Sequence, residues 1–162
     1  MWIFNIKLLI ILNLCINVDD YHHYAKKFPL LVWKKKNWTI FSPDAKSKQN
    51  ISNVNIEPLS EDLFLKKFAS CYGIICAGGF TTTSEAIFLG KPMLVVPVEA
   101  QIEQQFNAAA LKKEGVTVID RFSNENLGAI SNWIDSPSVL KIEYKDESKE
   151  IVDTLINDYS NL

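Results

Sequence analysis

The stretch "CAGGFTTTSEAIFLGKP", residues 76–92, lies near the middle of the 162-residue chain and carries its clearest structural pattern. An apolar run at residues 73–77 leads into the two glycines and predicts a buried strand. The residues after the glycines predict a helix over 83–89, which Gly90 ends. Because ligands of α/β proteins bind at the carboxyl ends of strands, this order of strand, glycine loop and helix predicts a binding loop.

Strand and helix patterns alternate on both sides of this stretch. The other predicted strands are apolar runs at residues 6–13, 38–41, 54–56, 93–97 and 116–119. The other predicted helices cover residues 21–34, 60–70, 101–115, 124–134 and 148–159. Ser60 is the predicted N-cap of its helix, and Ile102, Phe106 and Ala109 recur at helical spacing. The alternation predicts right-handed βαβ units, and hence an α/β fold with a Rossmann-like parallel sheet and helices on both faces.

Composition limits the classes of function. A chain of 162 residues, 48% of them hydrophobic, fits one domain with a core of ordinary size. The formal net charge of -2 gives no basic field for binding nucleic acid. The run from Lys34 to Lys36, between Trp33 and Trp38, is interpreted as solvated lysines at a helix end rather than as a nucleic-acid patch.

The cysteine and histidine residues predict no metal site. Cys15, Cys71 and Cys76 are odd in number and lack the spacing of metal ligands, which favours reduced thiols in a cytoplasmic protein. His22 and His23 are adjacent, so on a helix they point about 100° apart and do not form a metal-binding pair.

The apolar N-terminal segment, residues 1–18, allows three interpretations. We expect a buried first strand, because strands of parallel sheets read as continuous apolar runs. A signal peptide or membrane anchor is the second interpretation, although Asn13 and Asn17 interrupt the run, which is shorter than the about 20 residues of a membrane span. A mis-started reading frame is the third.

The glycine loop suits an anionic ligand. Gly78 and Gly79 let a ligand approach the backbone, and the free N–H groups of the following helix attract a phosphate or diphosphate. The alternative is a capping box, in which Thr82 and Glu85 satisfy each other's backbone donors. A dinucleotide site is a further alternative, because Glu99 lies 20 residues after Gly79, although the G-x-G-x-x-G pattern is incomplete.

Residues 76–116 resemble the donor-binding motif in the C-terminal half of GT-B glycosyltransferases. The motif combines the glycine loop with "T-x-x-E-A-x-x-L-G-K" and a following "E-Q-x-x-N-A". This group includes the bacterial N-acetylglucosaminyltransferase of peptidoglycan synthesis and the UDP-glucuronosyl and plant UDP-glucosyl transferases. The likeness is greatest to uncharacterised bacterial glycosyltransferases, and it covers residues 57–119.

The resemblance implies a role for each matching residue. The donor diphosphate would bind the loop residues Gly78, Gly79, Phe80, Thr81 and Thr82. The Glu85 carboxylate would accept hydrogen bonds from the ribose hydroxyls. The sugar would contact the first polar residues of the next helix, Glu103, Gln104 and Gln105. The backbone of Leu59 would contact the base, and Asn107 would hold the turn.

The resemblance also implies an inverting glycosyltransferase with a UDP-sugar donor and no cofactor or metal ion. Family members bind the acceptor, a glycan or a lipid, in a separate N-terminal domain, for which this chain has no room, so the catalytic base stays unassigned. We therefore expect residues 1–162 to form one donor-binding domain of the cytoplasm, peripheral to the inner face of the membrane if the acceptor is a lipid.

The chain would be a subunit of a split transferase with an acceptor-domain partner, a fragment, or a non-catalytic nucleotide-sugar-binding module. Ala77 stands where the plant enzymes have a His, so the resemblance does not specify the identity of the donor sugar.

Overall fold

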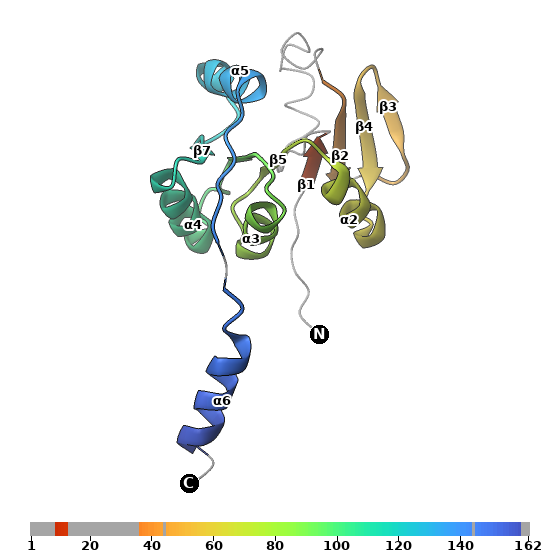
Figure 1. The fold of residues 1–162 in the computed structure, drawn as a ribbon. Coiled ribbons are helices and arrows are strands. Elements are labelled where there is room, and N and C mark those ends of the chain that lie inside the picture. The colour runs from red at the N-terminus through yellow and green to blue at the C-terminus, as the bar shows by residue number, and fades with distance from the viewer. Residues whose placement is uncertain (1–8, 13–35, 44, 144, 160–162) are drawn as a thin grey trace.

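Seven strands form one sheet in the part of the chain that the computed structural model describes, residues 9–12, 36–43, 45–143 and 145–159 (Figure 1). In chain order they are β1 Leu9–Leu12, β2 Trp38–Ser42, β3 Gln49–Ile51, β4 Val54–Pro58, β5 Ile74–Cys76, β6 Met93–Val95 and β7 Thr117–Val118. Their order in the sheet is β3-β4-β2-β1-β5-β6-β7. Apart from the edge strand β3, this is the strand order of a doubly wound Rossmann sheet, which confirms the predicted α/β fold.

The direction of the first strand differs from the prediction. β2 and β4 are parallel, as are β5, β6 and β7, but β1 runs antiparallel to both of its neighbours. An apolar run specifies burial, which is the same for either strand direction, so the pattern of residues 6–13 did not determine it. Because β1 opposes both neighbours, β2 and β5 point the same way. The carboxyl ends of β4, β5 and β6 therefore meet at one edge of the sheet.

A short edge strand, β3, was not predicted. Its three residues are all exposed, and it pairs antiparallel with β4. The sequence from Ser42 to Asn50, which includes the first two residues of β3, is mostly polar and has no period-two apolar pattern, so it was interpreted as a loop. The strand extends the sheet away from the glycine loop.

The helices α2, Glu61–Ser70, α3, Phe80–Phe88, and α4, Ile102–Lys113, connect the strands on either side of the glycine loop. The crossovers from β4 to β5, β5 to β6 and β6 to β7 all move in one direction across the sheet, so right-handed connections place these three helices on one face. A 3-10 turn, η1, Asn124–Asn126, leads into α5, Leu127–Asp135, which lies on the opposite side of β7 from α4 in Figure 1. The last helix, α6, Ser148–Tyr159, projects away from the sheet.

The start and stop signals read from the sequence hold for several helices. The Ser60 hydroxyl accepts a hydrogen bond from the Leu63 N–H at 3.4 Å, which confirms the predicted N-cap of α2. Gly90 and Gly115 have positive φ angles just after α3 and α4, as expected for glycines that end helices. The helix predicted at residues 21–34 and the residues Cys15, His22, His23, Lys34 and Lys35 lie outside the described residues.

The core lies between the sheet and the helices. Its largest fully buried side chains are Trp38, Phe41, Phe68, Ile74, Ile75, Leu94 and Ile130. On α4, however, the apolar stripe seen in the sequence faces solvent: Ile102 is 72% exposed and Phe106 is 74% exposed. The residues of α4 that face the core are Ala108 and Leu111. Helical periodicity thus predicted α4 correctly, but its apolar stripe does not mark the buried face of the helix.

No helix among the described residues is long and apolar enough to cross a membrane.

The two described cysteines are buried thiols. Burial raises the pKa of both Cys71 and Cys76 to about 11, from an ordinary value of 9.0. At pH 8 this shift lowers the thiolate fraction about 100-fold, and the thiolate is the form that reacts.

We therefore expect iodoacetamide to modify Cys76 of the native protein at least about 100-fold more slowly than the same residue in urea. Mass spectrometry of the alkylated peptides measures both rates. Comparable rates in the two conditions would contradict the burial of this thiol in the β5 strand.

Candidate functional site

The residues singled out in the sequence lie at the edge of the sheet where β4, β5 and β6 end. Leu59 follows β4 and is half exposed, and the glycine loop follows β5. Glu103, Gln104 and Gln105 lie in the first turn of α4, after β6. Leu59 is three strand spacings, about 14 Å, from β5 along the sheet, so it can meet only the far end of an elongated ligand bound at the glycine loop.

The two glycines of the loop have different environments. Gly78 has a φ of 82°, and a Cβ atom on it would lie 2.9 Å from Cγ1 of Val95 and 3.4 Å from the backbone oxygen of Gln104. Gly79 has a φ of -62°, and a Cβ atom there would have no neighbour within 4 Å. Gly78 thus packs the loop against β6 and α4, whereas Gly79 borders open space.

The start of α3 has no side-chain cap. The helix begins at Phe80 rather than at Thr83, and its N-cap residue, Gly79, provides no side-chain hydrogen bond. Thr82 is therefore the third residue of the helix and cannot be its N-cap, so the capping-box alternative is wrong. An extended Gly79 allows the helix to start this early. The N–H groups of Phe80, Thr81 and Thr82 have no acceptor within the helix and suit an anion.

The Thr83 side chain forms hydrogen bonds with the backbone at the start of α3. Its hydroxyl donates to the carbonyl oxygens of Gly79 and Phe80, at 3.1 and 3.0 Å. Thr83 is buried, whereas Thr82 is half-buried, and the described residues provide no hydrogen-bond partner for the Thr82 hydroxyl. Of these two threonines, Thr82 is the one placed to meet a ligand.

Amide side chains of α4 hold both neighbouring loops. Gln104 accepts a hydrogen bond from the Val98 N–H at 3.0 Å, and Gln105 donates one to the Val98 carbonyl at 3.3 Å. The Asn107 amide donates to the Gly78 carbonyl at 3.1 Å, which confirms that Asn107 holds the turn. Gln104 thereby uses its oxygen within the protein and keeps its NH₂ group for a ligand. These contacts join non-local residues, so no local sequence signal reveals them.

The acidic residues of the site are available to a ligand. Glu85, in the second turn of α3, is half-buried, and Glu103 is exposed. Neither carboxylate has an ion pair or a hydrogen bond to another residue in the described part of the chain. A half-buried carboxylate without a protein donor is suited to accept hydrogen bonds from hydroxyl groups. Across the described residues, no group of three His, Cys, Asp or Glu side chains could hold a metal ion.

Two further charged residues, one just before β6 and one near the end of β4, have structural partners. Lys91 of the "GKP" segment donates to the carbonyl oxygens of Ala69 and Cys71, at 2.8 and 2.7 Å, and so ties β6 to the end of α2. Glu57, a buried residue at the end of β4, pairs with Lys48 at 2.8 Å. Sequence reasoning missed Glu57, and only a buried acid in an otherwise apolar strand could have signalled it.

Comparisons with known proteins agree with this arrangement. Residues 31–135 match the family model described as "Glycosyl transferase family 1". A relative from Desulfitobacterium hafniense (strain DSM 10664 / DCB-2) is 27% identical over 115 residues, which are 67% of this chain. That protein is named UDP-N-acetylglucosamine--N-acetylmuramyl-(pentapeptide) pyrophosphoryl-undecaprenol N-acetylglucosamine transferase, and the match spans 27% of its length.

The two glycines provide a matched pair of variants. Gly78→Ala places a methyl group against Val95 in a left-handed backbone conformation, so we expect it to lower the free energy of unfolding by at least about 2 kcal/mol. Gly79→Ala should change it by less than about 1 kcal/mol, because the space beside Gly79 is open. Urea denaturation measures both. Equal losses would show that Gly78 is not tightly packed.

Proposed function

Because the chain belongs to glycosyl transferase family 1, we propose that it binds the nucleotide-sugar donor of a glycosyl transfer reaction, with a UDP-sugar as that donor. The observation that carries the proposal is the uncapped start of α3 at the glycine loop, with the free Glu85 carboxylate one turn further on. A cluster of N–H donors beside a carboxylate acceptor suits a diphosphate joined to a ribose.

The donor would lie along the edge of the sheet. Its diphosphate would accept hydrogen bonds from the N–H groups of Gly79 to Thr82 and from the Thr82 hydroxyl. The ribose hydroxyls would donate to Glu85, and the base would extend toward Leu59. The sugar would meet Glu103 as an acceptor and the Gln104 NH₂ group as a donor, because the Gln104 oxygen already accepts from Val98.

This site would stabilise the leaving group of an inverting displacement. The acceptor hydroxyl would attack the anomeric carbon as the bond from that carbon to the diphosphate oxygen breaks. Negative charge then grows on the diphosphate, where the backbone donors and the dipole of α3 stabilise it. A base must also remove the proton of the attacking hydroxyl, and we assign that role to a partner that holds the acceptor.

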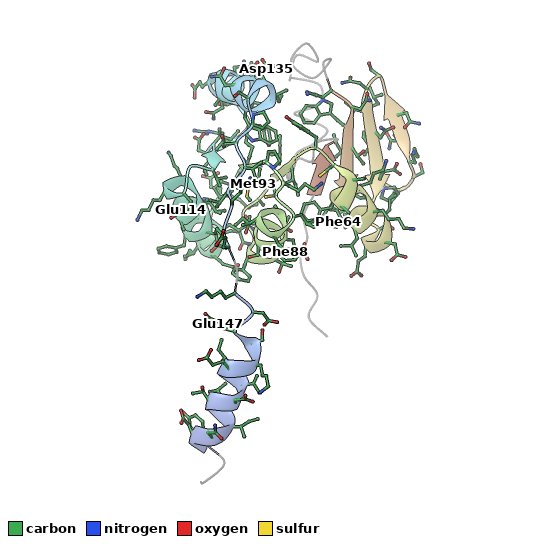
Figure 2. All side chains as sticks on the ribbon, viewed as in Figure 1. Phe64, Phe88, Met93, Glu114, Asp135 and Glu147 are labelled. Atoms are coloured by element: carbon green, nitrogen blue, oxygen red, sulfur yellow. The ribbon has the colours of Figure 1, made fainter. Side chains whose placement is uncertain are left out.

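The last helix is where that partner would dock. The apolar residues Ile151, Val152, Leu155, Ile156 and Tyr159 are all at least half exposed, and the α6 side chains stand clear of the rest of the protein in Figure 2. Exposed apolar stripes of this kind mark interaction sites. Since the chain spans 27% of the length of its relative, we propose an acceptor-binding domain or subunit as the occupant.

The name of the relative specifies an undecaprenol-linked acceptor for that protein. By analogy we propose a sugar or lipid-linked acceptor, in the cytoplasm at the inner face of a membrane. We also propose a hexosyl group as the transferred unit. A nucleotide-sugar-binding module that does not catalyse transfer would have the same donor site. It would differ from a transferase subunit only in the partner that it binds.

Calorimetric titration with UDP, several UDP-sugars and NAD tests the donor assignment. We expect UDP to bind, a preference among the sugars, and no binding of NAD. Glu85→Ala should weaken the affinity for UDP at least about tenfold, because the ribose hydroxyls lose a charged hydrogen-bond acceptor. Its free energy of unfolding should change by less than about 1 kcal/mol, since Glu85 does not cap α3.

The matched control is Glu114→Ala, an exposed acid at the opposite end of α4, which should leave UDP affinity within twofold. A folded wild-type protein that binds NAD and not UDP would refute the proposal. Unchanged UDP affinity in Glu85→Ala would refute the ribose assignment alone.

The docking role of α6 makes a separate prediction. Replacing Ile151 and Leu155 together with Asp should change the free energy of unfolding by less than about 0.5 kcal/mol, because neither side chain is buried in this chain. Ile130→Asp, in the fully buried core, should instead unfold the protein. Urea denaturation compares them. A large loss in the α6 variant would mean that this helix packs on its own domain and does not receive a partner.

A further inference from the structure

We propose that Asn107 is a positioning residue that aims the Gly79 N–H group at the donor diphosphate. The inference rests on the proposed function and adds a second-layer contact to that site. Its basis is the hydrogen bond from the Asn107 amide to the Gly78 carbonyl, 3.1 Å long, between residues 29 positions apart in the chain.

The geometry of the peptide group links this hydrogen bond to the site. The peptide between Gly78 and Gly79 is trans, so its C=O and N–H groups point in opposite directions. Since the Gly78 carbonyl points at Asn107 on α4, the Gly79 N–H points away from α4. The described residues offer this N–H no acceptor, and a Cβ atom built on Gly79 would have no neighbour within 4 Å.

The peptide needs an external anchor because glycines flank it on both sides. A peptide between two glycines rotates more freely than others, since no Cβ atom restricts the φ and ψ angles on either side of it. Val95 and the Gln104 backbone leave no room for a Cβ atom at Gly78, so this position stays a glycine. The orientation of the following peptide plane depends on the hydrogen bond that its carbonyl accepts, and Asn107 supplies it.

The oriented N–H completes a cluster of donors. Gly79 is the N-cap of α3, so its N–H adjoins the free N–H groups of Phe80, Thr81 and Thr82. Consecutive backbone N–H groups that point to one side form a concave anion-binding surface. If the peptide rotated, a carbonyl oxygen would replace one of these donors and would repel the diphosphate.

The experiment compares UDP with uridine, which has the same base and ribose but no phosphate. We expect Asn107→Ala to weaken the affinity for UDP about tenfold, as for one lost charge-assisted hydrogen bond. The affinity for uridine should stay within twofold of the wild-type value. Asn107→Leu keeps nearly the same side-chain shape but has no hydrogen-bond donor, and it should give the same result. It therefore shows whether the loss of affinity comes from the missing hydrogen bond or from the cavity that Ala leaves. Calorimetry measures the affinities, and urea denaturation verifies folding.

Asn55→Ala is the matched control. Asn55 is also half-buried, and its amide donates to a backbone carbonyl distant in sequence, that of Trp38 at 3.3 Å, but on β4. It should leave the affinities for both ligands unchanged. Equal weakening of UDP and uridine, or unchanged UDP affinity in both Asn107 variants, would overturn the inference while the donor assignment stands. A wild-type protein that binds neither ligand would overturn both.

Discussion

The close contact between Gly78 and Val95 is the constraint on which the candidate site depends. A side chain at position 78 would collide with β6, so only glycine lets the loop after β5 fold down between β6 and α4. With the loop in that position, Gly79 can start α3, and the first N–H groups of α3 face the carboxyl edge of the sheet. Asn107 then fastens the same loop to α4. One glycine thereby fixes both the packing and the electrostatic character of this edge.

Much of the fold could be predicted because its signals are local. β2 is rich in large apolar residues and β4 has apolar residues at alternate positions, Val54 and Ile56, while Ser60 and Gly90 mark helix ends through their own backbone preferences. The direction of β1 could not be predicted, because apolar patterning is the same for either direction. The buried face of α4 could not be predicted, because an apolar stripe at helical spacing does not show which side of the helix packs on this sheet.

The candidate site was predictable in its composition and not in its contacts. The glycine loop was predicted as an anion site from its own residues, and the resemblance to GT-B enzymes added Glu85 and the residues of α4. The competing capping box failed because α3 starts at Phe80, a choice that depends on the backbone of Gly79. The partners of Gln104 and Asn107 are set by tertiary packing, so only the structure could reveal that the Gln104 oxygen already accepts a hydrogen bond from Val98.

The proposed donor site is centred on the start of α3, whose free N–H groups would receive the diphosphate. The measurement that tests this is a titration of the ¹⁵N-labelled protein with UDP, followed by amide chemical shifts. The largest shifts should fall on Gly79, Phe80, Thr81 and Thr82, with smaller ones in the loop after β6 and none in β3. Shifts that cluster at another surface, or a glycine loop that does not respond to saturating UDP, would contradict the account.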